Sequence, residues 1–330
     1  MTLTFFGDTV LDKPYHLDFE IDRFVFNLET PLSCEGTPAL HKVNICQEKS
    51  YIKETFRDTP LAVSLANNHV MDYGEEAFKK TKKILKEQNI PYFGAGVKSE
   101  NFNNPIVIAF GDKKIGLCSY CCPSAHPTFG DEKNNGSAYL DPKEVLKDIE
   151  KLQEKKVDMI IVQPHWGIQE IPFPTFSDRE MAHLFIDNGA DMVIGHHAHV
   201  IQSHEIYNGK YIFYGLGNFI FPDLNMPSYH NGKEFTVMRY KIQKIQHRRS
   251  IVVDIDHDLN ISFFGVELNG DTITKREFKL PMWLPNSQKE FQKKLARQYK
   301  INMIKKFMDE PKLPTLAHLK RFAKLFKKRA

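Results

Sequence analysis

Short hydrophobic runs alternate with segments of helical periodicity along the first two thirds of the chain. The runs are rich in β-branched and aromatic residues and end in polar residues, which predicts buried strands. We expect these strands at 3–6, 24–26, 61–66, 90–93, 105–110, 114–120, 157–162, 192–194, 211–214 and 217–221. Apolar residues three and four apart predict helices over 75–88, 142–154 and 181–188, the last opened by a capping box at Ser177. Strands that alternate with helices predict an α/β fold built in layers.

The pattern changes twice after residue 221. Residues 235–280 alternate apolar and polar positions, which predicts antiparallel strands accessory to the site, with a hairpin turn at Asn269-Gly270. Residues 285–330 are rich in lysine and predict a basic helical tail with one apolar face, formed by Leu319, Phe322, Ala323 and Phe326. We therefore expect one domain over 1–284, followed by the tail.

The positive charge of the protein belongs to the tail. The net charge is +4, but residues 285–330 hold fourteen Lys and Arg and three acidic residues, so the tail carries +11 and residues 1–284 carry −7. Such a helix can bind an anionic membrane surface or a partner protein, or it can pack on the negatively charged domain. We favour the first two. No nucleic-acid-binding motif accompanies the charge, so no nucleic-acid partner is expected.

The cysteines indicate the kind of compartment in which the protein resides. They number five, without regular spacing, which predicts no disulfide framework and fits a reducing compartment. Cys118, Cys121 and Cys122 lack a second pair at zinc-site spacing, so we expect buried free thiols. The first residues enter a strand pattern without a signal segment, and no apolar run is long enough to span a membrane. These features predict a cytoplasmic protein, with contact at the inner membrane face through the tail.

Residues that can bind metal ions follow the ends of several predicted strands. The densest group is 195–199, Gly-His-His-Ala-His, directly after the strand at 192–194. On an extended segment, residues two apart point the same way, so His197 and His199 can converge while His196 faces elsewhere. The other strand-end candidates are Asp8, Glu29, Asn68 and His165. Carboxylate, amide and imidazole ligands of this kind suit one or two divalent ions, such as Mn, Fe or Zn.

A site of this composition predicts hydrolytic chemistry. Two ions bridged by a carboxylate and a hydroxide would hold a phosphoryl group and lower the pKa of the attacking water. His69 follows the candidate ligand Asn68 and could act as general acid toward the leaving oxygen, with Asp72 orienting it. By contrast, we expect Asn27 and Asn67 to hold loops through hydrogen bonds from side chain to backbone rather than to touch metal.

Taken in order, these motifs closely resemble those of the CapA family of poly-gamma-glutamate capsule biosynthesis proteins. The resemblance runs from about residue 2 to residue 221 and rests on 7–8, 27–29, 66–69, 72–74, 165–167, 195–199 and 217–219. It implies the four-layered α/β/β/α sandwich of calcineurin-like metallophosphoesterases. It also implies a set of roles: Asp8 and His199 at one metal, Asn68, His165 and His197 at the other, Glu29 bridging, and His69 as the acid.

The chain departs from the broader phosphoesterase pattern at two positions. That pattern begins with Asp-x-His, whereas Val10 stands two residues after Asp8, and Glu29 stands where a bridging aspartate is usual. A single tightly held ion would therefore satisfy the same sequence.

The resemblance implies a metal-dependent hydrolase of capsule or cell-surface polymer biosynthesis that cleaves a phosphoester. Two alternatives stay open. The same metal could direct hydrolysis of an amide or ester bond in an anionic polymer. Alternatively, the protein could be a non-catalytic, metal-binding assembly factor of the polymer machinery. Hydrolysis of aryl phosphates in added Mn²⁺ would separate the first function from the others.

Overall fold

The computed structural model describes residues 1–309 and divides into two units, Met1–Pro285 and Asn286–Ala330. The described part of the second unit contains one helix, α5 (Gln288–Asp309). The predicted apolar face at 319–326 lies outside the described residues. None of the helices in residues 1–309 is both long and apolar enough to cross a membrane.

The first sheet holds nine strands in the order β2-β19-β18-β17-β1-β3-β4-β5, with β14 also paired to β1. Their bounds are β1 (Thr2–Thr9), β2 (His16–Leu17), β3 (Arg23–Leu28), β4 (Ala62–Ser64), β5 (Tyr92–Phe93), β14 (Asn218–Ile220), β17 (Arg249–Asp256), β18 (Ile261–Asn269) and β19 (Thr272–Lys275). Strands β1, β3, β4 and β5 are parallel, whereas β17 pairs antiparallel with β1. The strands predicted as accessory are therefore integral, because β17 to β19 complete the sheet that contains β1.

The second sheet holds six strands in the order β12-β13-β11-β10-β8-β7. Their bounds are β7 (Ile106–Phe110), β8 (Lys113–Cys121), β10 (Met159–His165), β11 (Met192–Ile194), β12 (His204–Tyr207) and β13 (Lys210–Phe213). Strands β7 and β8 form the predicted antiparallel pair. Two further pairs stand apart from both sheets, namely β6 (Ala95–Gly96) with β9 (Gly136–Ser137) and β15 (Leu224–His230) with β16 (Phe235–Lys241).

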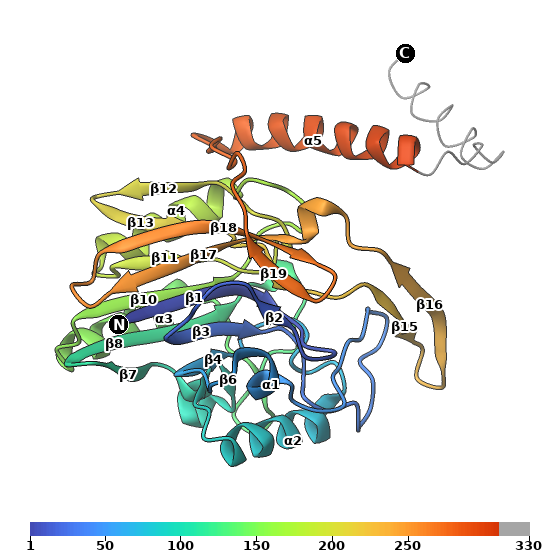
Figure 1. Ribbon diagram of the computed structural model, residues 1–330, viewed down its shortest axis with the longest axis horizontal. Helices are drawn as coiled ribbons and strands as arrows, with labels where there is room; N and C mark the ends of the chain where they lie inside the picture. Colours follow the sequence, from blue (N-terminus) through green and yellow to red (C-terminus); the bar gives the residue numbers. More distant parts are fainter. Residues whose placement is uncertain (310–330) are drawn as a thin grey trace. The chain divides into compact units, whose positions relative to one another are not determined.

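Three buried clusters of hydrophobic side chains define the layers. The middle cluster lies between the sheets and joins Phe5 of β1 to Ile161 of β10. A second cluster packs α1 (Ile52–Phe56) and α2 (Gly74–Glu87) on the outer face of the first sheet. A third packs α3 (Pro142–Glu154) and α4 (Phe176–Asp187) on the second. The order is helix, sheet, sheet, helix, and the predicted α/β/β/α sandwich is confirmed (Figure 1).

The helix ends show how local sequence sets the elements that carry the site. Helix α3 begins as predicted, with the Asp141 side chain accepting a hydrogen bond from the N–H of Lys143 at 3.0 Å. Helix α4 begins five residues earlier than predicted, because Thr175, not Ser177, is the capping residue. Thr175 and Asp178 exchange side-chain hydrogen bonds to each other's backbone N–H at 3.0 and 3.2 Å, which completes a capping box.

Candidate metal centre

The predicted ligands lie at the carboxyl ends of strands from both sheets, where the sheets stack. Asp8 is near the end of β1 and His165 is the last residue of β10, while the others lie in the loops after β3, β4 and β11. All are buried, and the most exposed, His199, keeps 9% of its surface accessible. The six side chains brought together are Asp8, Glu29, Asn68, His165, His197 and His199.

The histidine loop after β11 is not extended, contrary to the prediction. His197 and His199 have positive φ angles of 89° and 54°, a conformation that is uncommon for non-glycine residues. The loop begins at Gly195, where a Cβ atom would lie 1.9 Å from the carbonyl oxygen of Tyr214. The two imidazoles therefore converge because the backbone turns sharply between close-packed segments.

One group of candidate ligand atoms gathers around Asp8. One ligand atom each from Asp8, Glu29 and His199 lie within 4.8 Å of one another. The Nδ1 atom of His199 lies 3.4 Å from Asp8 Oδ2 and 2.9 Å from the side-chain oxygen of Asn218. Two carboxylates and an imidazole at this spacing can hold a divalent cation, and Asn218 is in place to orient the ring.

A second group surrounds the Nε2 atom of His165. Asn68 Oδ1 lies 2.9 Å from it, His197 Nδ1 lies 3.2 Å away, and Glu29 Oε1 lies 3.5 Å away. One ring nitrogen carries at most one proton and cannot donate to all three. Moreover, Glu29 Oε1 and His165 Nδ1 are buried without a hydrogen-bond partner. This donor set fits a cation, and Glu29 belongs to both groups, as a bridging ligand would.

The pKa values of the two buried carboxylates shift in opposite directions. Burial raises the pKa of Asp8, but hydrogen bonds from His196 and His199 outweigh it and hold that pKa well below its usual value. Burial and the nearby charge of Asp8 raise the pKa of Glu29 well above its usual value. His196, predicted to face elsewhere, places its Nδ1 atom 3.1 Å from Asp8 Oδ1. A bound cation would favour the ionised form of both acids.

The buried imidazoles are held neutral. Burial, followed by the neighbouring His197, lowers the pKa of His165 well below its usual value. Burial and the neighbouring His199 lower the pKa of His197 to about 3. A neutral imidazole has a free lone pair, which is the form that binds metal ions.

Two asparagines support the site. The predicted hydrogen bonds from side chain to backbone are confirmed for Asn67, whereas Asn27 bonds to other side chains instead. Asn27 donates through Nδ2 to Asp8 Oδ1 at 2.9 Å and to Glu29 Oε2, so it spaces the two carboxylates. Asn67 accepts a hydrogen bond from the N–H of His69 at 3.0 Å. Both asparagines thus position site residues through hydrogen bonds.

His69 is oriented by a buried carboxylate. Its Nδ1 atom lies 2.6 Å from Oδ2 of Asp72, and the ring lines the cavity in front of the ligands. Burial lowers the pKa of His69, although Asp72 opposes this effect. Asp72 also accepts the N–H of Ile45 at 2.8 Å and pairs with Lys42 at 2.5 Å. The carboxylate is therefore fixed from three sides.

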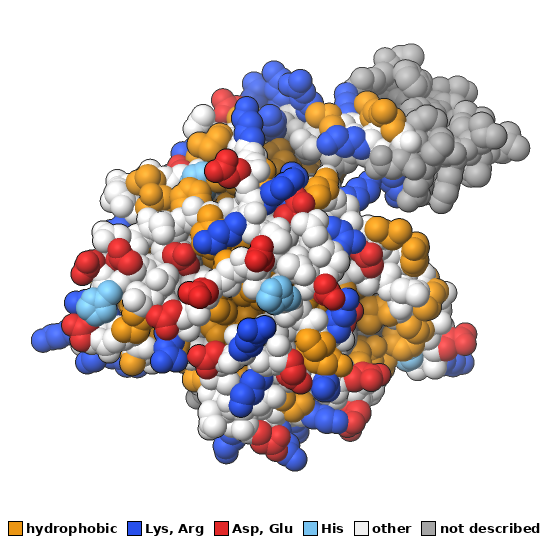
Figure 2. Space-filling model, in the orientation of Figure 1, with side chains coloured by type: hydrophobic (Ala, Val, Ile, Leu, Met, Phe, Trp, Pro, Cys, Tyr) orange, Lys and Arg blue, Asp and Glu red, His pale blue; other side chains and the backbone are white. Residues whose placement is uncertain are grey.

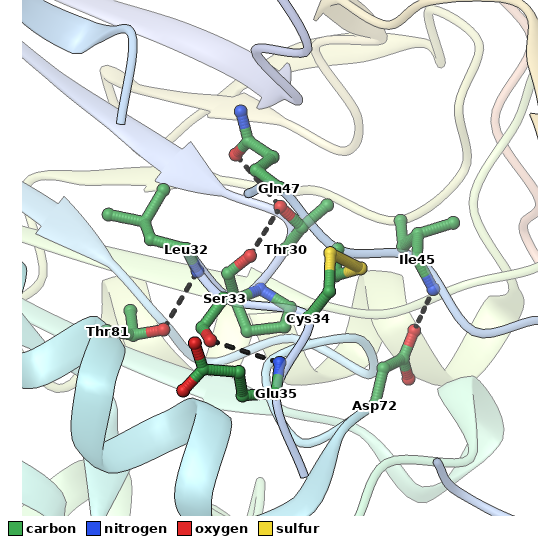
Figure 3. The surroundings of a disulfide bond; sticks show 11 residues. Thr30, Leu32, Ser33, Cys34, Glu35, Ile45, Gln47, Asp72 and Thr81 are labelled. Atoms are coloured by element: carbon green, nitrogen blue, oxygen red, sulfur yellow. Dashed lines mark hydrogen bonds between the residues drawn. A yellow bond between two sulfur atoms is a disulfide. The ribbon is translucent and has the colours of Figure 1, made fainter. Parts of the chain in front are cut away.

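Lys42 and Ile45 belong to a loop closed by a disulfide bond between Cys34 and Cys46 (Figure 3). The prediction that the cysteines form no disulfide is wrong for this pair. The odd number of cysteines gave no sign of this bond, which forms because the fold brings the two Cα atoms to 5.3 Å. The other three cysteines are free thiols, as predicted. Cys118 and Cys121 are buried, and Cys122 is half-buried.

A cavity of about 500 Å³ opens in front of the ligands. His69, His197 and His199 line it together with cationic side chains that the motif analysis missed, namely Lys42, Arg239 and Lys241. No motif marks these cations. The only signal for the last two is the alternation of 235–241, which places them on one face of a strand.

The fold and the site define an α/β/β/α sandwich with a buried cluster of carboxylates and imidazoles at its strand ends. More particularly, the chain belongs to the family described as bacterial capsule synthesis protein PGA_cap, whose sequence model matches residues 4–223. The resemblance to the CapA family is thereby confirmed.

Two CapA proteins illustrate the relationship. The chain is 31% identical over 202 residues to the capsule biosynthesis protein CapA of Bacillus anthracis, covering 59% of this chain and 49% of that protein. It is 29% identical over 239 residues to the PGA biosynthesis protein CapA of Bacillus subtilis, covering 71% and 61%. The chain thus matches only about half to three fifths of the length of these relatives.

Solved structures are more distant. A 5′-nucleotidase precursor from Thermus thermophilus has a TM-score of 0.42 at 15% identity and covers 92% of this chain and 59% of that one. A phosphatase from Mycoplasma pneumoniae has a TM-score of 0.44 at 13% identity, covering 83% and 90%. Likenesses at these scores transfer no function.

Proposed function

We propose that this protein is a metal-dependent hydrolase of poly-gamma-glutamate-type capsule or cell-surface polymer biosynthesis, and that it cleaves a phosphoester. The observation that carries this proposal is the convergence of Asn68, His197 and Glu29 on the Nε2 atom of His165. A single proton on Nε2 cannot serve all three neighbours, and Glu29 Oε1 has no hydrogen-bond partner, whereas a divalent cation would use these atoms as ligands.

The proposal assigns each ligand a place. Asp8 and His199 would hold one ion, the three side chains around His165 would hold a second, and Glu29 would bridge. Divalent ions bound there, such as Mn, Fe or Zn, would lower the pKa of a water molecule and neutralise charge on a phosphoryl oxygen. Val10 stands where the broader phosphoesterase pattern has a histidine, so the number of bound ions, one or two, has to be measured.

His69 would protonate the leaving oxygen. It lines the cavity beside Asn68, and the hydrogen bond at 2.6 Å to Asp72 fixes the orientation of the ring. Asp72 would act as the positioning residue, because its other hydrogen bonds leave it no freedom to turn away.

One observation favours a second candidate reaction at the same centre. The cations that line the cavity, Lys42, Arg239 and Lys241, suit carboxylates as well as phosphates. Hydrolysis of an amide or ester bond in an anionic polymer therefore also fits the cavity.

Metal content and hydrolysis, measured together, test the proposal. Elemental analysis of the wild type should give two ions per chain, and the protein should hydrolyse an aryl phosphate in added Mn²⁺. His197→Ala should lose metal and activity together, whereas His16→Ala, which removes an exposed histidine remote from the ligands, should keep both. Less than one ion per chain, with no hydrolysis in any metal, would overturn the proposal and favour an assembly role.

Location and partners also stay proposals. Deleting residues 311–330, which lie outside the described part, should release the protein from membranes without reducing hydrolysis if the tail is a docking element. The predicted cytoplasmic location conflicts with the Cys34–Cys46 bond, since disulfides persist in oxidising compartments. Lysing the cells directly into denaturant that contains an alkylating agent decides the matter, because it exposes the buried thiols: five modified cysteines indicate a reducing compartment, and three indicate an oxidising one.

A further inference from the structure

The disulfide loop, residues 34–46, holds the proposed general acid in place. Lys42 of this loop pairs with Asp72 at 2.5 Å and also donates to the carbonyl oxygen of the residue before His69. Ile45 donates its N–H to Asp72 at 2.8 Å. Asp72 in turn lies 2.6 Å from the Nδ1 atom of His69. The disulfide loop therefore fixes both the carboxylate that orients the imidazole and the backbone that carries it.

The disulfide bond ties this loop to a firm support. Cys34 lies in the segment after β3, which is attached to α2 because the N–H of Leu32 donates to the hydroxyl of Thr81 at 2.8 Å (Figure 3). Thr81 is fully buried. Cys46 is the neighbour of Ile45 in the chain. The covalent bond thus transmits the position of the α2 support to the N–H that holds the carboxylate.

The β15–β16 hairpin, on the other side of the disulfide loop, gives weaker support. The N–H of Tyr229 in β15 donates to the carbonyl oxygen of Lys42 at 3.0 Å, but the hairpin belongs to neither large sheet. Hydrophobic side chains gather over it at the surface, where Met238 and Tyr240 are 61% and 70% exposed (Figure 2). A two-stranded hairpin is marginally stable by itself. The hairpin alone would therefore not keep the disulfide loop in place.

Reductants can reach the bond, because Cys34 and Cys46 are only half-buried. A dithiol opens a disulfide in two exchange steps. One thiolate of the dithiol attacks one sulfur, which releases the other cysteine and leaves a mixed disulfide. The second thiol of the reductant then releases the first cysteine. The protein gains two electrons and two protons in this exchange, and the dithiol leaves as a disulfide.

We infer that the Cys34–Cys46 bond is a redox control of the candidate metal centre: the oxidised form holds the general acid in place, and reduction by a dithiol releases it. This inference rests on the proposed function and deepens it, because it names a regulation of the same site. With the bond open, Asp72 loses the fixed positions of its two partners in the loop, and His69 loses its fixed orientation. The candidate ligands lie outside the disulfide loop, so the metal stays bound.

Reduction should slow hydrolysis only in part. The N–H of Gln47 still donates to the carbonyl oxygen of Pro31 at 3.0 Å, which keeps the end of the loop near its support. A general acid matters most when the leaving group is poor, and phenol leaves less readily than nitrophenol. In the Mn²⁺-loaded full chain, a dithiol should therefore lower kcat about tenfold for phenyl phosphate and about twofold for nitrophenyl phosphate. Metal content should stay unchanged, and reoxidation should restore kcat.

Three variants serve as controls. The double variant Cys34→Ser, Cys46→Ser should behave as the reduced wild type and should not respond to the dithiol, which excludes an effect of the dithiol on the metal. Asp72→Asn removes the residue through which the loop acts, so reduction should leave its kcat nearly unchanged. Cys122→Ser removes a half-buried free thiol outside the loop and should respond to the dithiol as the wild type does.

Hydrogen exchange at the N–H of Ile45 gives a second measurement that needs no hydrolysis. Reduction should speed this exchange, because the N–H loses its fixed acceptor on Asp72. Thermal unfolding checks that each form is folded, and the reduced wild type carries the test if the double variant does not fold.

Several results would overturn the inference. These are an unchanged kcat or an unchanged exchange rate after reduction, an equal loss of kcat for both phosphates, loss of metal on reduction, or the same loss of kcat in Asp72→Asn as in the wild type. A protein that hydrolyses neither phosphate, although reduction speeds exchange at Ile45, would refute the hydrolase and support the hold of the bond on Asp72.

Discussion

Replacing Cys34 and Cys46 with serine should lower the free energy of unfolding by about 3 kcal/mol. The bond joins residues 12 positions apart, and closing a loop of that length removes chain entropy from the unfolded state worth about 3 kcal/mol at 25 °C. The measurement is urea unfolding of the oxidised wild type and of the double variant. Cys122→Ser, which removes a half-buried free thiol, is the control and should unfold close to the wild type.

Counting thiols makes the same prediction sharper. The denatured wild type should show three reactive thiols before reduction and five afterwards. Activity should fall as well, because the closed loop holds Lys42 and Ile45 against Asp72. Five thiols before reduction would show that the bond is absent. A stability loss below about 1 kcal/mol in the double variant would refute the reasoning from loop entropy.

Three other predictions concern single residues. Asp72→Asn should lower kcat for an aryl phosphate by roughly a hundredfold or more, because His69 loses its charged partner; steady-state kinetics would contradict this if kcat stayed within threefold. Burial, followed by the charge of Lys241, lowers the pKa of His247 to about 4. Between that value and the usual pKa of about 6.5, the unfolded chain binds a proton that the folded chain excludes. The free energy of unfolding should therefore fall as the pH drops from about 6.5 to about 4. Urea unfolding at pH 7 and pH 5 should show a smaller loss in His247→Gln. Gly195→Ala should cost about 2 kcal/mol or more, because its Cβ would meet the backbone 1.9 Å away, and an unchanged melting temperature would contradict it.

The positions of the candidate ligands could be predicted because their signal is local. Apolar runs mark the buried strands, and a polar residue at the end of a run, such as Asp8 or His165, marks the edge where sites form. Stacked layers then bring such ends together, so the order of the motifs along the chain was sufficient to predict that these side chains gather.

Contacts between distant loops gave no such signal. The Cys34–Cys46 bond, the pair of Lys42 with Asp72, and the inward face of Arg239 all depend on how long loops pass over the strand ends. The pairing of β17 with β1 was missed for a related reason, since alternation predicts a strand but not its partner.

The pairing of β17 with β1 also affects the order in which the sheet can form during synthesis. Thr2 at the start of β1 lies opposite Asp256 at the end of β17, so the edge of β1 stays open until the ribosome has made nearly the whole domain. At roughly 5–20 residues per second, the wait is on the order of 10–50 s. During that time, residues 2–5 of β1 can pair only on their other side, with β3. The open edge of β1 is the segment that a chaperone would have to shield until β17 covers it.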